Sequence, residues 1–536
     1  MASKSKVFVR EATGLVREMS ILDVAIYNFA IFGLPFATYF TMGFIPVLGG
    51  NFLEAMLISA ILGIFVIYAY YCFQVVMPRS SGDYIFISRT LFGSLGFVSN
   101  AGYVLITVIY IGINGVLIQS TGFSVLFALL GGLYNNSTMV SLASAVNQPG
   151  WLFVLGTIET LVVGSLAIFG KRAYFTVQNV AYIIVIIGMF VLVGLLATSS
   201  NQSFQAAFNA YSAHYTNSTD YYDAIISIAT KNGWSPPDTN NFYNTMLLLP
   251  PLTAYGIGFY FSSYLGGEIK NTRKTSLFGN YASFAFVIIF ETILTLVAYN
   301  TLGYNWLSAL DSQLTTGNLS LPVIPYLNFL ALVLTSNPLI IIFVVMVGIL
   351  QLLIFVPAAV ILISRSFMAY SFDRILPEAF SRVSDRWHTP VIAVVFGLAL
   401  GELALILLDI PLTAAGVYLF TTVALWYVAL LPVFVVGLSA AVFPYLKKQI
   451  FESSAVNQRV AGIPLMSIGG LGTMIYSLIV VYLSLSNPIF GANGEGAIAT
   501  LVVVVVLLFV LYFGSKYVRK RSGIDLGLVF HEIPPE

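Results

Sequence analysis

LLLPPLTAYGIGFYFSSYLGGEIKNTRKTS, residues 247–276, decides the fold of this chain. The stretch begins as an apolar span, is interrupted by Gly256 and Gly258, and ends in a basic loop. Inside a bilayer, unwound backbone is tolerated only where protein covers it or where it lines a cavity, because no water satisfies its polar groups. Interrupted membrane helices of this kind commonly mark transport sites. The stretch therefore predicts a polar site within the membrane.

Composition indicates that the whole chain is a membrane protein. Of its 536 residues, 58% are hydrophobic and only 8% are charged, a balance that a water-soluble globule cannot accommodate. The first 20 residues are too polar to form a cleaved signal, so the first span is expected to stay in the mature chain. The single cysteine, Cys72, excludes an internal disulfide framework. We expect an all-α polytopic membrane protein.

The sequence contains twelve apolar runs that are long enough to cross a hydrocarbon core. A helix needs about 20 residues for this. They cover residues 22–48, 52–77, 94–130, 150–169, 174–198, 245–266, 278–301, 336–370, 390–409, 411–444, 465–486 and 497–514. The two longest polar stretches between them, 199–244 and 302–335, are predicted as outer loops.

A second interruption is expected in the first span, where Gly33 precedes Pro35. Proline fits the first turn of a new half-helix, and a helix N-terminus inside the bilayer would favour a carboxylate. A simple proline kink is the alternative. The next interrupted span follows five spans later, as expected if spans one to five and six to ten form an inverted repeat.

Orientation follows from the basic residues. Of the 23 Lys and Arg residues, all except Lys231 lie on one side of the predicted spans. The positive-inside rule places that side and both termini in the cytoplasm, so we predict a multi-pass protein of the plasma membrane. The predicted segments are a cytoplasmic N-terminal segment 1–21, a first repeat 22–198, an extracellular loop 199–244, a second repeat 245–444, peripheral helices within 465–514, and a cytoplasmic tail 515–536.

Three ordered motifs carry a resemblance to a known family. They are MPRSSGDYIFISRTLFG at residues 77–93, GEIKNTRK at 267–274, and SRSFMAYSFDRILPEAFSRVSDRWHTP at 364–390. In this order and topology they resemble the amino acid, polyamine and organocation (APC) transporter superfamily, with Thr272 where the family has proline. The resemblance implies a five-plus-five inverted repeat with discontinuous helices 1 and 6, two peripheral helices, and movement of amino acids by alternating access.

The resemblance also implies a substrate site at the two interruptions. The substrate carboxylate would meet backbone in the first span and the amino group would meet carbonyls in the sixth. On the third span, four polar side chains spaced by 4, 3 and 4 share one helical face; an alternative role for them is hydrogen bonding between helices. The candidate residues are Ile31, Phe32, Gly33, Leu34, Tyr103, Thr107, Tyr110, Asn114, Ala254, Tyr255, Gly256, Ile257, Gly258 and Tyr260.

Departures from the family bear on substrate and coupling. Many relatives that handle basic substrates have a Glu after the Gly-aromatic pair of span six, where this chain has Tyr260. Residues 338–363 contain no Ser or Thr, so the hydroxyls that usually help to bind sodium are missing. Residues 173–197 contain no Lys, which some proton-coupled relatives use. A basic substrate and sodium coupling are therefore disfavoured.

Three acidic residues, Glu159, Glu291 and Glu402, lie near the middle of predicted spans. A carboxylate in hydrocarbon is costly unless it is neutral, paired or hydrated. Glu159 and Glu291 are candidates for proton coupling, and a protonated Glu bonded to a neighbouring helix is the alternative for each. Asp373, Arg374 and Glu268 are expected to be inner-gate or loop-anchoring charges.

Other chemistry is set aside on residue grounds. The chain has no phosphate-binding G-x-x-x-x-G-K-[ST] loop and no HExxH pair, and its histidines lie far apart at 214, 388 and 531. We predict no enzyme activity, cofactor, metal site or nucleic-acid partner. The predicted function is secondary transport of neutral or apolar amino acids, by proton symport or exchange. The alternatives are a polyamine or organic cation transporter and a non-transporting amino acid receptor of the same fold.

Overall fold

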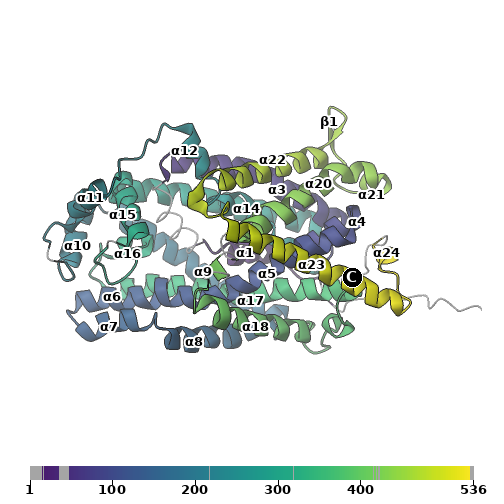
Figure 1. Cartoon of the computed structure of the whole chain (residues 1–536), viewed down its shortest axis with the longest axis horizontal. Coiled ribbons are helices and arrows are strands. Elements are labelled where there is room, and N and C mark those ends of the chain that lie inside the picture. The colour runs from purple at the N-terminus through teal and green to yellow at the C-terminus, as the bar shows by residue number, and fades with distance from the viewer. Residues whose placement is uncertain are drawn as a thin grey trace, which may run out of the picture.

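The computed structural model describes residues 15, 17–34, 48–216, 218–317, 319–413, 416–417, 419 and 423–530. This part of the chain is a bundle of long helices (Figure 1). Its only strands are a short hairpin of β1 (Arg459–Val460) and β2 (Ile463–Pro464). The expected all-α class is confirmed.

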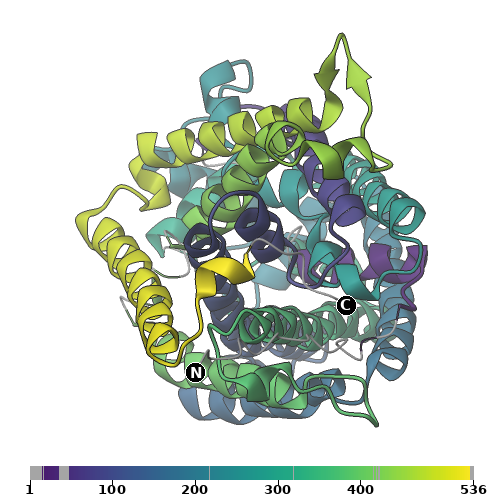
Figure 2. The ribbon, with the colours of Figure 1, turned by 90° about the vertical axis from the view of Figure 1, so that its right-hand side faces the viewer.

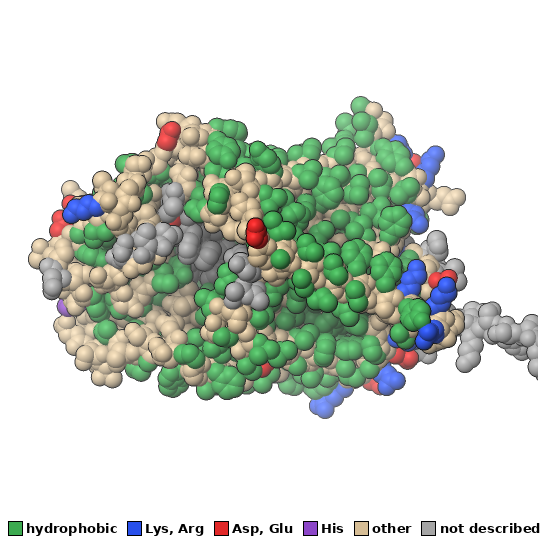
Figure 3. Space-filling model, in the orientation of Figure 1, with side chains coloured by type: hydrophobic (Ala, Val, Ile, Leu, Met, Phe, Trp, Pro, Cys, Tyr) green, Lys and Arg blue, Asp and Glu red, His purple; other side chains and the backbone are tan. Residues whose placement is uncertain are grey.

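Within the described residues, nine helices are long and apolar enough to cross a membrane. They are α3 (Phe52–Val76), α5 to α6 (Gly93–Leu133, with the π-helix η2 at Ile118–Phe123), α8 to η4 (Pro149–Ala167, with the π-helix η3 at Ile158–Val163), α9 (Lys171–Ala197), α14 (Thr272–Leu302), α17 (Pro338–Phe372), α18 and the π-helix η8 (Val391–Asp409), α22 (Leu465–Ser486) and α23 (Glu495–Arg521). On the face that Figure 3 shows, apolar side chains form a broad band across the molecule.

Three further predicted spans are present as shorter pieces. The first is α1 (Ile21–Phe32), and the tenth includes η10 (Trp426–Leu430) and α20 (Leu431–Leu446). The sixth consists of α12 (Phe242–Leu247), α13 (Thr253–Ile257) and the 3-10 turns η5 (Phe261–Tyr264) and η6 (Gly266–Glu268). Residues 35–47 and parts of 414–422 lie outside the described residues.

Two ends of the bundle differ in composition. On the face that Figure 3 shows, Lys and Arg side chains gather toward the end at the right of Figures 1 and 3, called the basic end here. Figure 2 looks at this end and shows α22 and α23 at the periphery. The helix α4 (Gly82–Thr90) lies in the connection between α3 and α5, and all nine of its residues are buried. The first of the three motifs is therefore folded into the bundle.

The opposite end is a folded cap. Its helices are α7 (Ser137–Ala145), α10 (Asn201–Ser212), α11 (Tyr221–Lys231), α15 (Tyr304–Thr316) and α16 (Leu327–Leu332). Trp306 is 1% exposed, stacks on Tyr222 at 4.8 Å between ring centroids, and contacts Phe204 and Phe208. The segments predicted as polar loops thus contain amphipathic helices around an aromatic core, because their apolar residues recur at helical spacing.

Glycines allow several helices to touch through their backbones. A Cβ on Gly63 of α3 would lie 2.2 Å from the carbonyl oxygen of Gly256, and one on Gly470 of α22 would lie 2.4 Å from that of Gly437 in α20. Small residues at such crossings are what membrane helices use for close packing. Gly256 therefore belongs to the packing of span six against α3.

Replacing Gly63 by alanine is expected to lower the free energy of unfolding by about 1–3 kcal/mol, because backbone atoms of Gly256 occupy the space of the new methyl group. The thermal midpoint of the detergent-solubilised protein measures the effect. Gly194→Ala on α9 is the matched control, since nothing lies within 4 Å of its added Cβ. Equal midpoints for the two variants would contradict the tight crossing.

Candidate functional site

The first helix ends at the predicted interruption. α1 begins with a capping box between Ser20 and Asp23 and ends at Phe32. Gly33 follows with φ +71°, in the left-handed region that favours glycine, and its N–H donates to the carbonyl of Phe29 at 2.9 Å. In this structure the Gly33 N–H therefore caps α1.

Neighbouring helices bind carbonyls near the end of α1. The hydroxyl of Tyr182 in α9 donates to the carbonyl of Phe29, and Nε2 of Gln351 in α17 donates to that of Ala30 at 3.4 Å. A Cβ on Gly33 would lie 3.7 Å from the same Gln351 nitrogen. The interruption therefore lies between α9 and α17 in the interior of the bundle.

The second interruption follows α13, where the backbone leaves the helix at Gly258. Asn28 of α1 reaches across to this backbone: its side-chain nitrogen donates to the carbonyl of Phe259 at 3.2 Å, and its oxygen accepts from the N–H of Ser262 at 3.0 Å. One amide thus satisfies an acceptor and a donor that the helix leaves free, as the membrane interior requires.

A ring of buried polar side chains extends this contact. Asn28 also donates to Asn280 of α14 at 3.0 Å, and Asn280 donates to Gln74 of α3 at 3.0 Å. Gln74 donates to the hydroxyl of Ser262 at 3.1 Å, which in turn donates to Asn280 at 2.9 Å. All four side chains are fully buried. The ring therefore joins spans one, two, six and seven at the interruption.

The two interruptions meet through an aromatic contact. The ring of Phe32 lies 5.4 Å from that of Tyr255, edge to face, and 5.3 Å from that of Phe259, stacked. A Cβ on Gly258 would lie 2.6 Å from the Phe32 ring, so glycine is needed there for the close approach. The structure thus brings the predicted residues of both spans together.

The other predicted substrate residues fall into three groups. Tyr260 stacks on Tyr70 of α3 at 3.8 Å, and Tyr103 lies 6.3 Å from Phe261 and 5.8 Å from Tyr264 between ring centroids. Thr107 and Asn114 donate to carbonyls of their own helix, and Tyr110 lies partly buried on the same face. Ile31 and Ala254 are partly buried and Leu34 and Ile257 are buried, while Gly256 packs against Ser59 and Tyr476.

The candidate acids are buried. Glu159 is 3% exposed, and neither of its carboxylate oxygens has a hydrogen-bonding partner in the described part of the chain. Glu291 on α14 is 1% exposed, and Glu402 accepts from the hydroxyl of Thr157 at 2.6 Å. Sequence reasoning missed Asp409, which is 8% exposed and, like Glu159, lies in a π-helical turn. Such turns are frequent at functional sites.

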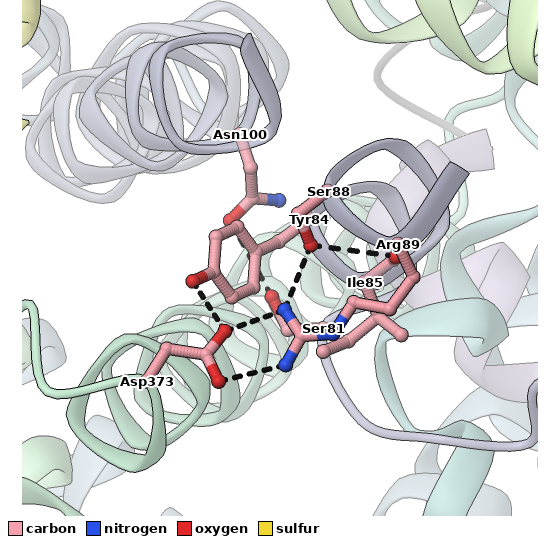
Figure 4. A network of polar contacts seen from close by, with 7 residues as sticks. All are labelled: Ser81, Tyr84, Ile85, Ser88, Arg89, Asn100 and Asp373. Carbon is pink, nitrogen blue, oxygen red and sulfur yellow. Dashed lines mark hydrogen bonds and ion pairs between the residues drawn. The ribbon is translucent and has the colours of Figure 1, made fainter. Parts of the chain in front are cut away.

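An ion-paired network ties the basic end together (Figure 4). Arg89 of α4 forms a two-point contact with Asp373 at the end of α17, at 2.5 and 2.7 Å, and the Tyr84 hydroxyl donates to the same carboxylate at 2.5 Å. Arg365 of α17 pairs with Glu268 at 2.7 Å. All of these side chains are buried. The network therefore holds α4, α17 and the end of span six together.

Backbone and cavities complete this end. The N–H groups of Glu18 and Met19 donate to the carbonyl of Glu268, both at 3.0 Å, and Lys270 donates to the carbonyl of Met19 at 3.2 Å. Two cavities of about 340 and 810 Å³ open beside α9, and both are lined by Glu18, Arg172 and Thr176. Neither is lined by a predicted substrate residue.

Sequence reasoning also missed three residues of the buried polar ring: Asn28, Gln74 and Asn280. A signal exists for Asn28, which is a lone amide in an apolar run five residues before Gly33. A polar residue at that depth must find a partner. Its partners could not be found in the same way, because they are 231 and 252 positions away.

A bundle of membrane-spanning helices in which two interrupted helices meet is typical of secondary transporters. The family model for amino acid permeases matches residues 31–524. The chain therefore belongs to the amino acid permease family, a transporter family of the APC superfamily, and the resemblance drawn from the three motifs is confirmed. Among individual curated proteins, none gives a significant match.

Changing either Arg89→Gln or Asp373→Asn alone should lower the free energy of unfolding by about 3–5 kcal/mol, because the remaining charge stays buried without its partner. The double variant should lose less than the sum of the two. Thermal midpoints of the purified variants measure this. Arg459→Gln is the control: its ion pair with Glu452 is 40% and 43% exposed and is expected to contribute about 0–1 kcal/mol. Additive losses at Arg89 and Asp373 would contradict the coupling.

Proposed function

We propose that this permease is a secondary active transporter that moves neutral or apolar amino acids across the plasma membrane by alternating access, either coupled to protons or by exchange. The observation that carries the proposal is the contact between the two helix interruptions, in which Phe32 packs against Tyr255 and Phe259. Both interruptions lie in the interior of the bundle, where backbone groups can be presented to a bound zwitterion.

The predicted substrate residues favour a substrate without net charge. The candidate set contains aromatic, aliphatic and small residues, one Thr and one Asn, but no Asp, Glu, Lys or Arg. A basic side chain or a polyamine buried there would find no counter-charge within the predicted set, which is costly in a low dielectric. Backbone carbonyls and half-helix ends are sufficient for the amino and carboxylate groups of an amino acid.

The basic end is best explained as the cytoplasmic end, with both termini inside, because the positive-inside rule applies to the connecting loops. On this assignment the pairs Arg89–Asp373 and Arg365–Glu268 form an inner gate that is closed in this structure. Release of substrate to the cytoplasm would require these pairs to separate. Glu159 and Glu291 remain candidates for binding a coupled proton.

Uptake of a labelled amino acid mixture by proteoliposomes, with and without an inward proton gradient, tests the proposal. Accumulation driven by the gradient would support symport, and uptake that needs amino acid inside would support exchange. Binding without uptake would favour a receptor, and competition by polyamines alone would favour the organic cation alternative. Either of these last two results contradicts the proposal.

Gly33→Leu should abolish substrate binding while the protein still inserts, because a branched side chain at φ +71° would strain the end of α1. Gly317→Leu is the matched control, since Gly317 has φ +70°, lies in the cap and has nothing within 4 Å of an added Cβ. Ligand-induced thermal stabilisation measures binding in both variants. Normal binding by Gly33→Leu would show that the site is misplaced.

Gly256→Leu should behave differently from Gly33→Leu, because an added Cβ at Gly256 would lie 2.3 Å from the Tyr476 hydroxyl and 2.7 Å from the carbonyl oxygen of Ser59. We therefore expect this variant to be recovered in low yield. Folding yield by size-exclusion chromatography distinguishes it from Gly33→Leu, whose yield should remain normal.

A further inference from the structure

One carboxyl group near the inner gate has no role in the function proposed above. Asp83, on α4, is completely buried and makes no ion pair among the described residues. Its Oδ2 accepts a hydrogen bond from the Tyr264 hydroxyl at 2.5 Å, while its Oδ1 has no partner in the described part of the chain. The nearest basic residue on the same helix, Arg89, forms its ion pair with Asp373. Asp83 is therefore a buried carboxyl without a compensating cation.

Aromatic hydroxyls surround this carboxyl from every neighbouring element that has titratable groups facing it. Five tyrosines lie close enough to interact electrostatically with Asp83. They are Tyr70 on α3, Tyr103 on α5, Tyr260 and Tyr264 in span six, and Tyr370 on α17. The remaining neighbour, α20, contributes only Tyr445, which is 62% exposed. On α4 itself, Tyr84 and Arg89 are bound to Asp373. No basic group neutralises Asp83 from these elements.

The same carboxyl is connected to the closed gate. Asn100 of α5 donates to the Tyr264 hydroxyl at 3.2 Å and accepts from the hydroxyl of Tyr370 on α17. The N–H of Ser81, two residues before Asp83, donates to the carbonyl of Tyr264 at 2.9 Å, and the Ser81 hydroxyl contacts Ser366 of α17 at 3.2 Å. Separation of spans six and eight at this end would therefore expose Asp83 to water.

The carboxyl also lies beside the predicted substrate region. Tyr260, a predicted substrate residue, stacks at 3.8 Å on Tyr70. The hydroxyls of both tyrosines are buried without a hydrogen-bonding partner among the described residues, as is Oδ1 of Asp83. Three polar groups that lack partners thus lie in one cluster, between the site of the interruptions and the inner gate.

We propose that Asp83 binds the coupled proton, holding it while the inner gate is closed and releasing it to the cytoplasm when the gate opens. This inference rests on the proposed transport function. The step is a proton transfer alone: the O–H bond of the carboxylic acid breaks, the oxygen keeps the electron pair, and water accepts the proton.

The direction in which pH shifts the gate equilibrium follows from the burial of Asp83. Burial raises the pKa of Asp83 from 3.8 to about 6 in the closed state, and the neighbouring hydroxyls of Tyr264 and Tyr70 lower it by less. Hydration on opening returns the pKa toward 3.8, so the open state releases the proton. Raising the pH through this window favours opening, by up to about a hundredfold in the open-to-closed ratio. At pH values above about 6, Asp83 is ionised in the closed state as well, so a further rise in pH no longer favours opening.

Asp83→Asn tests the inference in proteoliposomes of the full-length protein. Labelled amino acid uptake is measured together with acidification of the interior, reported by a trapped pH-sensitive dye. The wild type should accumulate amino acid against its gradient and acidify the interior. The variant should lose both, by at least about tenfold, because an amide cannot release a proton in this range. Asp83→Glu should restore them, since it keeps a carboxyl group.

Asp311→Asn is the matched control, because it makes the same carboxyl-to-amide change at another buried group, on α15 in the cap. It should keep the ratio of protons to amino acid. If Asp83→Asn retains gradient-driven accumulation, or if Glu159→Gln loses it while Asp83→Asn does not, the inference is overturned. Exchange without proton movement by the wild type would also overturn it. Absence of any uptake by the wild type would instead contradict the proposed transport function.

Tyr264→Phe keeps the test decisive if Asp83→Asn fails to fold. Loss of the Tyr264 hydroxyl removes a hydrogen bond that lowers the pKa of Asp83, so the pH midpoint of proton-driven uptake should move upward. The same change at Tyr222, in the cap, removes a hydrogen bond to the carbonyl of Leu302 instead and should leave the midpoint in place. Identical midpoints in wild type and Tyr264→Phe would overturn the inference.

Discussion

The side chain of Asn28 satisfies the constraint on which the rest of the structure depends. Span six leaves its helix in the interior of a membrane protein, and an unsatisfied backbone group there costs several kcal/mol. Asn28 bonds to both the carbonyl of Phe259 and the N–H of Ser262, and Gln74 and Asn280 fix its orientation. The interruption can therefore exist without water, and spans one, two, six and seven are joined around it.

The interior is organised in two levels. Near the interruptions, contacts are aromatic or involve neutral amides, as with Phe32 against Tyr255 and Asn28 against Asn280. At the basic end they are ionic and bidentate, as between Arg89 and Asp373. Neutral groups tolerate a change of neighbours more cheaply than ions do, because a separated ion must be solvated. In the proposed transport cycle, the ionic level would therefore set most of the resistance to opening, and the neutral level would adapt to the substrate.

The sequence was sufficient for the spans, for both interruptions and for the family, since all three depend on local signals such as apolar run length, Gly33 and Gly258. It was insufficient where a contact joins distant positions, as between Asn28 and Asn280. Polar composition also gave no sign of internal structure in the predicted outer loop 199–244, where Phe204, Phe208 and Tyr222 form a folded core with Trp306. Asp83 was overlooked because no local feature of the motif at residues 77–93 indicates that α4 is buried.

The joint between the N-terminal segment and span six is made by main-chain atoms: Glu18 and Met19 donate to Glu268, and Lys270 donates to Met19. Main-chain hydrogen bonds do not depend on side-chain identity, except that proline has no N–H to donate. The residues at this joint are thus free to diverge during evolution without weakening it, and only the exclusion of proline at the three donor positions would remain as a trace of the constraint.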